Sequence, residues 1–503
     1  MIQMTEQRFF QILWLTLAIK LVFAWWIPIT GDEAYFITWG NHLDYGYYDH
    51  TPMVGWWLAA LLQINDSMLW LRLPSVLITT FIGWAIYHLT RSHSQTAALF
   101  AASLFLLAPV NLIAVLITTD TPLILFSFIS AWCFYKAQQH DQFGWYLACG
   151  LLLGLAFFSK FFAGLLGIAY FLYLVLFVRR GVRPYVGLLL IIAGTIPFIA
   201  ANLLWNYNHC WNNYLFNLYN RTSGSAFSLV TFSKYLVVMV YLFTPPIIYY
   251  LLKDFRGISK ILKDADKRIY AALFLIPIGL FFILSFWKVI GLHWLLSFYP
   301  FLFITLAYVF SEQQLKCSFY FMLAFSVVHV IALIVILALS PDLLKSNQRW
   351  LKSYVFSAYS TQITEKMNTI APDHQWATGS YGDSAVLSYA AKKRVIQFGR
   401  GSYHARQDDM LTDYRALDGK DILIIEYTDN LQHFARFFIE METGVIDVGG
   451  TNYYYVKGKG FRYAVYREKI IEKVMQSYYQ IPDFLPVDSC YMVEKYGAVN
   501  KLK

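Results

Sequence analysis

Charged residues are scarce in this chain. Only 14% of its 503 residues are Asp, Glu, Lys or Arg, while 58% are hydrophobic, whereas a soluble protein has about 25% charged residues. The scarcity excludes a purely soluble protein, and it is uneven. Residues 1–340 hold 19 Lys and Arg and 12 Asp and Glu, whereas residues 341–503 hold the other 21 and 19. We therefore expect a membrane domain over 1–340 and a soluble domain over 341–503, long enough to bury its own core.

Cysteine is also scarce, and no CxxC pair occurs. The five cysteines are an odd number, which suggests neither a disulfide framework nor a thiolate metal site. A bridge between Cys210 and Cys490 is conceivable if both lie outside the cytosol. The chain has no internal repeat and no Gly-rich phosphate loop, so a nucleotide-sugar site is not expected. Its first apolar stretch lacks a small-residue cleavage site and is interpreted as a retained helix.

Long apolar stretches are abundant before residue 340. A bilayer is crossed by roughly 20 apolar residues, and eleven segments qualify as candidate transmembrane helices. They cover about 9–29, 69–90, 95–117, 121–139, 144–158, 161–178, 184–204, 233–252, 269–287, 294–310 and 317–339.

The basic residues indicate an orientation. With the N-terminus in the cytoplasm, 13 of the 19 basic residues of the membrane part fall on the cytoplasmic side, as the positive-inside rule requires. An odd number of spans then places the C-terminal domain outside. The net charge of +9 is thus mostly an orientation signal and a contact with membrane lipids, and it does not indicate nucleic-acid binding.

The tail has the pattern of a small α/β domain. Alternating or apolar runs bounded by turn residues predict strands, and two other stretches have helical spacing. The predicted helices are Asp383–Ala391 and Asn430–Glu440, and the predicted strands are Arg394–Phe398, Asp421–Tyr427, Gly444–Gly449, Asn452–Val456 and Phe461–Tyr466.

Acidic residues on the outer side are concentrated in one loop. Five of the six lie in residues 30–68, among them Asp32, Glu33 and Asp49. Within this loop, Glu33–Leu43 and Met53–Gln63 could form amphipathic helices at the interface. Carboxylates this close to an apolar span are costly and usually mark a cavity or a functional pair. The sixth acid, Asp120, precedes a Pro-started helix, so it could cap that helix, belong to a site, or both.

Basic side chains accompany these acids on the outer side. Alone, each could be an interfacial side chain that extends toward water. Together with the carboxylates, they suggest a site that binds a phosphate and supplies a general base. They are Arg72, Lys160, Arg221, Lys288 and His293. A divalent metal is possible beside paired carboxylates, but no ligand spacing requires one.

Several motifs resemble a known family. GDEAYF, GYYDHTPMVGWW, RLPS, TTDTPLILF, FSKFFAGLL and HWLLSFYPFL resemble the membrane glycosyltransferases of the protein O-mannosyltransferase and aminoarabinose transferase type. The resemblance implies a multipass α-helical membrane protein of about 11 transmembrane helices with C-type glycosyltransferase architecture, followed by a small α/β extracytoplasmic domain.

The resemblance also assigns residue roles. It makes Asp32 the catalytic carboxylate and places Asp120 in the same cavity, so Glu33 and Asp120 are further catalytic candidates beside Asp32. The aminoarabinose transferases carry Glu-Lys where this chain has Asp49-His50. His50 would then be a weaker, pH-dependent donor to the carrier phosphate, or Lys160 or Lys288 would contact that phosphate instead.

The implied activity is transfer of a sugar from a polyprenyl-phosphate donor. The acceptor would be lipid A, lipopolysaccharide, another envelope glycan or a protein, on the outer face of a bacterial inner membrane. A transporter or flippase of lipid-linked saccharides is the alternative. The acids cluster on one side instead of at the midplane, and no inverted repeat is visible, both of which disfavour transport.

Overall fold

The chain forms two compact units. The computed structural model describes residues 4–140, 142–178, 182–222, 224–264, 267–339 and 349–497. A helical unit comprises Met1–Trp26, Ile64–Ala201 and Gly224–Leu337, and a mixed unit comprises Ile27–Gln63, Asn202–Ser223 and Ala338–Lys503. The predicted boundary at 340 lies outside the described residues. The division into domains 1–340 and 341–503 therefore stays a prediction.

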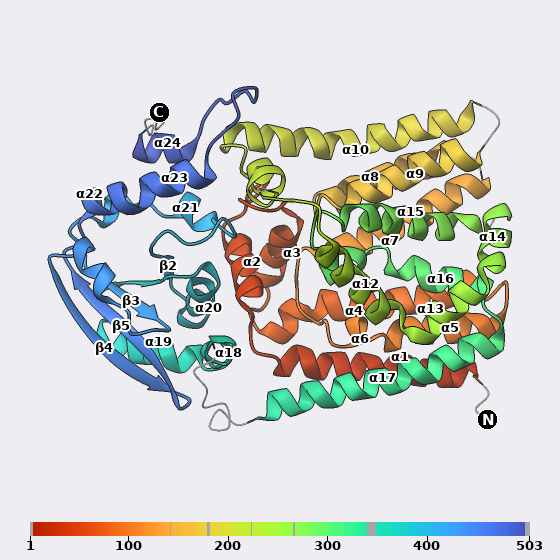
Figure 1. Ribbon diagram of the computed structural model, residues 1–503, viewed down its shortest axis with the longest axis horizontal. Coiled ribbons are helices and arrows are strands. Elements are labelled where there is room, and N and C mark those ends of the chain that lie inside the picture. The colour runs from red at the N-terminus through yellow and green to blue at the C-terminus, as the bar shows by residue number, and fades with distance from the viewer. Residues whose placement is uncertain are drawn as a thin grey trace. The chain divides into compact units, whose positions relative to one another are not determined.

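Helices make up the first unit, and every one of the eleven predicted apolar segments contains at least one of them. Contacts join α8 to α9 and α9 to α15, and these helices run side by side in Figure 1. The helices are α1 (Glu6–Trp26), α4 (Met68–Thr90), α5 (Gln95–Leu107), α6 (Pro109–Leu112), α7 (Asp120–His140), α8 (Phe143–Phe157), α9 (Ala163–Phe177), α10 (Arg183–Asn208, whose last turns belong to the mixed unit), α12 (Leu229–Phe243), α13 (Pro245–Lys253), α14 (Phe255–Lys263), α15 (Arg268–Leu284), the 3₁₀ turn Leu292–Leu295, α16 (Tyr299–Val309) and α17 (Glu312–Ala338).

Fewer helices than predicted are long enough to cross a membrane. Among the described residues, α1, α4, α10 and α17 have the necessary length and apolar composition. The pair α12 and α13, bent by 96°, adds a fifth if it is one span. Apolar helices of 10–17 residues account for most of the other predicted segments. The described part of the chain is thus mostly helical and contains several candidate membrane spans, while the count of eleven spans is not confirmed.

Glycines allow two of these helices to approach closely. A Cβ at Gly150 of α8 would lie 2.3 Å from the carbonyl oxygen of Ile191 on α10, and one at Gly154 would lie 2.1 Å from the Phe198 ring. The spacing Gly150-x-x-x-Gly154 is the small-residue pattern that brings membrane helices together.

The mixed unit contains a five-stranded sheet with the order β2-β1-β3-β5-β4. β1 (Gln375–Thr378) is parallel to β2 (Ile396–Gln397) and β3 (Ile422–Glu426), and β5 (Thr451–Lys459) is antiparallel to β3 and β4 (Glu440–Val448). β4 and β5 are the long blue pair at one edge in Figure 1. The helical elements are α2 (Gly31–Asn41), α3 (Met53–Leu62), α11 (Asn212–Tyr214), the π-helix Leu215–Asn220, α18 (Arg349–Ala358), α19 (Ser360–Ile370), α20 (Tyr381–Ala391), α21 (Gln407–Leu411), the 3₁₀ turns Tyr414–Leu417 and Gln432–Phe437, α22 (Tyr463–Tyr466), the π-helix Arg467–Ile471, α23 (Glu472–Tyr478) and α24 (Tyr491–Tyr496).

Most of the elements predicted in the tail are confirmed, and two are wrong. The predicted strand Phe461–Tyr466 contains helix α22, and its aromatic side chains Phe461 and Tyr466 both enter the core around Phe398. The predicted helix Asn430–Glu440 is a 3₁₀ turn that leads into β4. Packing of the aromatic rings in the core overrides their local strand propensity.

A disulfide joins distant parts of the mixed unit. Cys210 and Cys490 are bonded across 280 residues of sequence. Next to it, the Trp211 indole donates a hydrogen bond of 2.7 Å to the Pro486 carbonyl. The Cys210–Cys490 disulfide that the sequence made conceivable is therefore present. It attaches the segment after α10 to the C-terminal part of the mixed unit.

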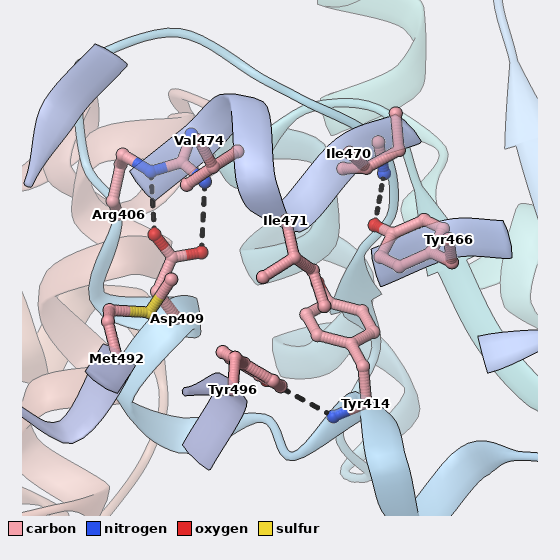
Figure 2. Close-up of a pocket in the computed structure, with 10 residues that line it drawn as sticks. Arg406, Asp409, Tyr414, Tyr466, Ile470, Ile471, Val474, Met492 and Tyr496 are labelled. Atoms are coloured by element: carbon pink, nitrogen blue, oxygen red, sulfur yellow. Dashed lines mark hydrogen bonds and ion pairs between the residues drawn. The ribbon is translucent and has the colours of Figure 1, made fainter. Parts of the chain in front are cut away.

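A small cavity lies beside a buried ion pair in the mixed unit. Figure 2 shows two hydrogen bonds from the Arg406 guanidinium to the Asp409 carboxylate, from Nε at 2.6 Å and from Nη2 at 3.0 Å. It also shows the Tyr414 backbone amide donating to the Tyr496 hydroxyl. The cavity between these residues and Tyr466 measures about 10 Å³, close to the volume that one water needs. It is therefore a packing gap of the core and too small for a substrate.

Candidate active site

The first predicted acids lie in the first turn of α2. Thr30 caps this helix through a capping box, in which its hydroxyl accepts from the Glu33 amide at 3.3 Å and the Glu33 carboxylate accepts from the Thr30 amide at 3.2 Å. Glu33 is completely buried, so its carboxylate stabilises the helix start. Asp32, one residue earlier, is exposed and accepts a hydrogen bond of 2.9 Å from the Tyr381 hydroxyl.

Asp49 is a second carboxylate of the same unit, and it is buried. The Tyr35 hydroxyl donates to Asp49 Oδ1 at 3.2 Å, and the Asn217 amide donates to the Asp49 carbonyl at 3.2 Å. Burial raises the pKa of the Asp49 carboxyl to about 7, and the negative charge of Asp32 adds to the rise. Asp32 is thus close enough for its charge to affect the pKa of Asp49.

Cationic and aromatic groups accompany the two carboxylates. Burial lowers the pKa of Arg221, and the charge of Asp49 opposes that shift. Burial also lowers the pKa of His404. The charge of Arg221 lowers this pKa further, and the charge of Asp32 raises it. Arg221 is therefore within electrostatic range of Asp49, and His404 is within electrostatic range of Arg221 and Asp32. This cluster of Asp32, Asp49, Arg221, His404 and Tyr381 is named the acid cluster.

The predicted phosphate contact His50 is half-buried among aromatic rings of the mixed unit. Its ring centroid lies 6.1 Å from that of Trp39 and 6.4 Å from that of Phe216. Phe216 also contacts the His404 ring at 5.6 Å. His50, in the loop between α2 and α3, and His404 therefore both contact the Phe216 ring.

The helical unit holds a buried ion pair between two predicted site residues. Lys160 Nζ lies 2.9 Å from each oxygen of Asp120, and their side chains are only 8% and 10% exposed. Asp120 is the first residue of α7, and Lys160 follows α8. Lys160 also lies 5.5 Å from the Phe162 ring. The structure therefore brings this acid and this base together.

The other predicted cations of the helical unit have different surroundings. Arg72 is fully buried and donates to the Ala24 carbonyl at 2.9 Å, which ties α4 to α1. His293 is exposed, and its neighbour Trp294 packs on the Phe162 ring at 4.6 Å, which places His293 on the segment that borders the Lys160 loop. Lys288 is half-buried after α15.

Metal ligation has no obvious place in this arrangement. In the part of the chain that the structure describes, no group of three or more His, Cys, Asp or Glu side chains is arranged to hold a metal ion. We therefore assign no metal ligand.

Asp49→Asn is expected to stabilise the protein at neutral and alkaline pH. The folded protein keeps the Asp49 proton up to about pH 7, whereas an ordinary Asp releases it near 3.8. The unfolded state therefore binds fewer protons between these values, and wild-type stability falls as the pH rises through that window. The variant should gain up to about 4 kcal/mol over wild type at pH 8 and little at pH 4. Unfolding of both purified proteins at the two pH values measures this, and a gain independent of pH would contradict it.

Comparison with known proteins gives concordant results. Residues 49–205 match the model of the family described as dolichyl-phosphate-mannose-protein mannosyltransferase. Lipid A galacturonosyltransferase RgtD of Rhizobium johnstonii is 30% identical over 186 residues, which are 35% of this chain and 38% of that protein. The match thus spans well under half the length of this curated relative.

The fold matches solved structures over nearly the whole chain. ArnT from Cupriavidus metallidurans bound to undecaprenyl phosphate gives a TM-score of 0.63 at 14% identity, covering 89% of this chain and 97% of that one. Its apo state gives 0.62 over the same shares. At this identity the likeness establishes the fold. The chain thus has the fold of ArnT, and its residues 49–205 are similar to the dolichyl-phosphate-mannose-protein mannosyltransferase family.

Proposed function

We propose that this protein transfers a sugar from a polyprenyl-phosphate donor to a lipid acceptor of the lipid A class, with Asp32 as the catalytic carboxylate. The observation that carries the proposal is an exposed Asp32 held by Tyr381 in a cluster with Arg221 and His404. The name of the relative RgtD supports a lipid A acceptor, and the carrier bound to ArnT supports a polyprenyl-phosphate donor.

The chemistry needs few groups. An acceptor hydroxyl oxygen attacks the anomeric carbon of the donor sugar, the bond from that carbon to the carrier phosphate breaks, and the hydroxyl proton passes to Asp32. The carrier phosphate leaves with the bonding electrons, and cations stabilise its charge. Arg221 suits this role within the acid cluster, and we keep His50, Lys160, Lys288 and His293 as candidates for the same contact.

Asp49, Arg72, Glu33 and Asp120 have other roles in the proposal. Asp49 and Arg72 are buried, so they act through the neighbours that they hold. Glu33 fixes the start of α2, and Asp120 positions Lys160.

A bacterial inner membrane with the mixed unit on the periplasmic side fits this chemistry. The Cys210–Cys490 disulfide supports an oxidising compartment for the mixed unit, and the distribution of basic residues supports a cytoplasmic N-terminus.

Mass spectrometry of lipid A tests the acceptor. Cells that express the gene should carry lipid A heavier by one sugar residue than lipid A from cells without it, and the Asp32→Asn gene should give the unmodified mass. Lipid A of equal mass in all three, with an altered glycan or protein elsewhere in the envelope, would contradict the lipid A acceptor.

A further inference from the structure

Helix α20 begins where the parallel part of the sheet ends. β1 lies between β2 and β3, parallel to both, and its last residue Thr378 leads through Ser380 into α20 at Tyr381. The turn is fixed by the Thr378 hydroxyl, which donates to the Ser380 carbonyl at 2.9 Å and pairs with the Ser384 hydroxyl at 2.8 Å. Residues at the carboxyl ends of parallel strands are the usual place for functional groups in open α/β sheets.

The N-terminal turn of α20 meets the N-terminal turn of α2 at a pair of glycines. A Cβ on Gly31 would lie 3.0 Å from Gly382 Cα, and a Cβ on Gly382 would lie 3.3 Å from Gly31 Cα. No larger residue fits at this distance without moving the helices apart. Each glycine is the sequence neighbour of one partner of the Tyr381–Asp32 hydrogen bond, so the close approach sets the position of that bond.

Tyr381 is held in place from a second side. Its ring packs edge-on against the Tyr35 ring, with centroids 5.3 Å apart, and Tyr35 in turn donates to Asp49. The Tyr381 hydroxyl donates to Asp32 Oδ1 at 2.9 Å. Burial raises the pKa of Tyr381, and the charge of Asp32 adds to this, so the phenol stays protonated and remains a donor. Asp32 also lies in the first turn of α2, where the helix dipole adds partial positive charge beside its carboxylate.

We propose that Tyr381 is a positioning residue for Asp32, and that the C-terminal part of the chain thereby completes the catalytic site. This inference rests on the proposed function. Tyr381 occupies one oxygen of the carboxylate and leaves the other to accept the proton of the acceptor hydroxyl. Without the hydroxyl of Tyr381, Asp32 is free to rotate at the start of α2 and spends less time in the reactive orientation.

Tyr381→Phe tests the proposal directly. In purified full-length protein, assayed with undecaprenyl-phosphate sugar and lipid A, we expect kcat to fall about 10- to 100-fold, the range of a hydrogen bond to a charged group. The KM for the donor should change less than about twofold, because Tyr381 is not assigned to donor binding. Tyr427→Phe is the matched control, since the Tyr427 hydroxyl donates at 2.9 Å to Asp383 of the same helix and not to Asp32.

A second variant separates position from the hydroxyl itself. Gly382→Val keeps Tyr381 but adds a side chain where even a Cβ is 3.3 Å from Gly31, so it should displace α20 from α2 and lower kcat as well. Hydrogen exchange of residues 30–36 provides a readout that does not depend on activity. It should be faster than wild type in both Tyr381→Phe and Gly382→Val, and unchanged in Tyr427→Phe.

The possible outcomes separate the two claims. In one outcome, the wild type is active, Asp32→Asn loses activity, and Tyr381→Phe keeps the wild-type kcat. This result would overturn the positioning role and leave the proposed function standing. Equal losses of kcat and of melting temperature in Tyr381→Phe and Tyr427→Phe would also overturn it, because both hydroxyls would then act only on folding. A wild-type protein that transfers no sugar from any polyprenyl-phosphate donor would overturn the proposed function and the positioning role with it.

Discussion

Asp32→Asn is expected to lower sugar transfer by about 10²- to 10⁴-fold, the usual contribution of a general base. Asn has the shape of Asp and can still accept the hydrogen bond from Tyr381, so the helix start and its capping box remain intact. The amide cannot take the proton of the acceptor hydroxyl. The measurement is the initial rate of transfer by purified wild-type and variant protein from the same donor.

Asp44→Asn is the matched control for this variant. Asp44 belongs to the same loop and accepts from the Trp205 indole at 2.9 Å, but it has no part in the acid cluster. Its variant should keep most of the wild-type rate. A rate for Asp32→Asn equal to that of Asp44→Asn would remove Asp32 from the chemistry.

Lys160→Met is expected to destabilise the protein by about 3–5 kcal/mol, the typical effect of leaving a buried charge without its partner. Lys160 Nζ lies 2.9 Å from each Asp120 oxygen, and neither side chain is more than 10% exposed. Removal of the ammonium leaves the Asp120 carboxylate in an apolar surrounding. The midpoint of unfolding in mild detergent measures the loss.

The double variant Lys160→Met with Asp120→Asn provides the control. It removes both charges at once, so most of the stability lost in Lys160→Met should return. If the stability lost in the double variant equals the sum of the losses in the two single variants, the two charges are not coupled. This result would contradict the close contact between Lys160 and Asp120.

Part of the site was predictable from local sequence. Clustering of acids pointed to residues 30–68, and the family resemblance singled out Asp32 among them. The structure finds Asp32 exposed in the first turn of α2. The structural use of Glu33 also had a signal, because Thr30-x-x-Glu33 has the spacing of a capping box. Because Glu33 is the sequence neighbour of Asp32, the two acids instead suggested a catalytic pair.

The remaining members of the site depend on contacts that no local pattern encodes. Tyr381 meets Asp32 across 349 residues of sequence, and His404 reaches the acid cluster from a tail that composition marked only as a soluble domain. Cys210 and Cys490 likewise pair across 280 residues. Such pairings follow from the topology of the sheet and from the helix contacts, which a single sequence does not reveal.

The number of membrane spans illustrates a different limit. Hydropathy located a helix in each of the eleven apolar segments because burial in lipid and burial in protein favour the same residues. It could not separate long helices such as α17 from shorter ones such as α16, which is buried along most of its length. The α12–α13 bend of 96° follows Thr244, which has a positive φ and precedes two prolines.

Transfer in detergent tests the central claim most directly. Purified protein, given undecaprenyl-phosphate sugars and lipid A in detergent micelles, should form glycosylated lipid A and free undecaprenyl phosphate in equal amounts, without any sealed membrane. Absence of product from every donor in micelles, together with movement of the intact lipid-linked sugar across the bilayer of reconstituted vesicles, would contradict the account and identify a transporter instead.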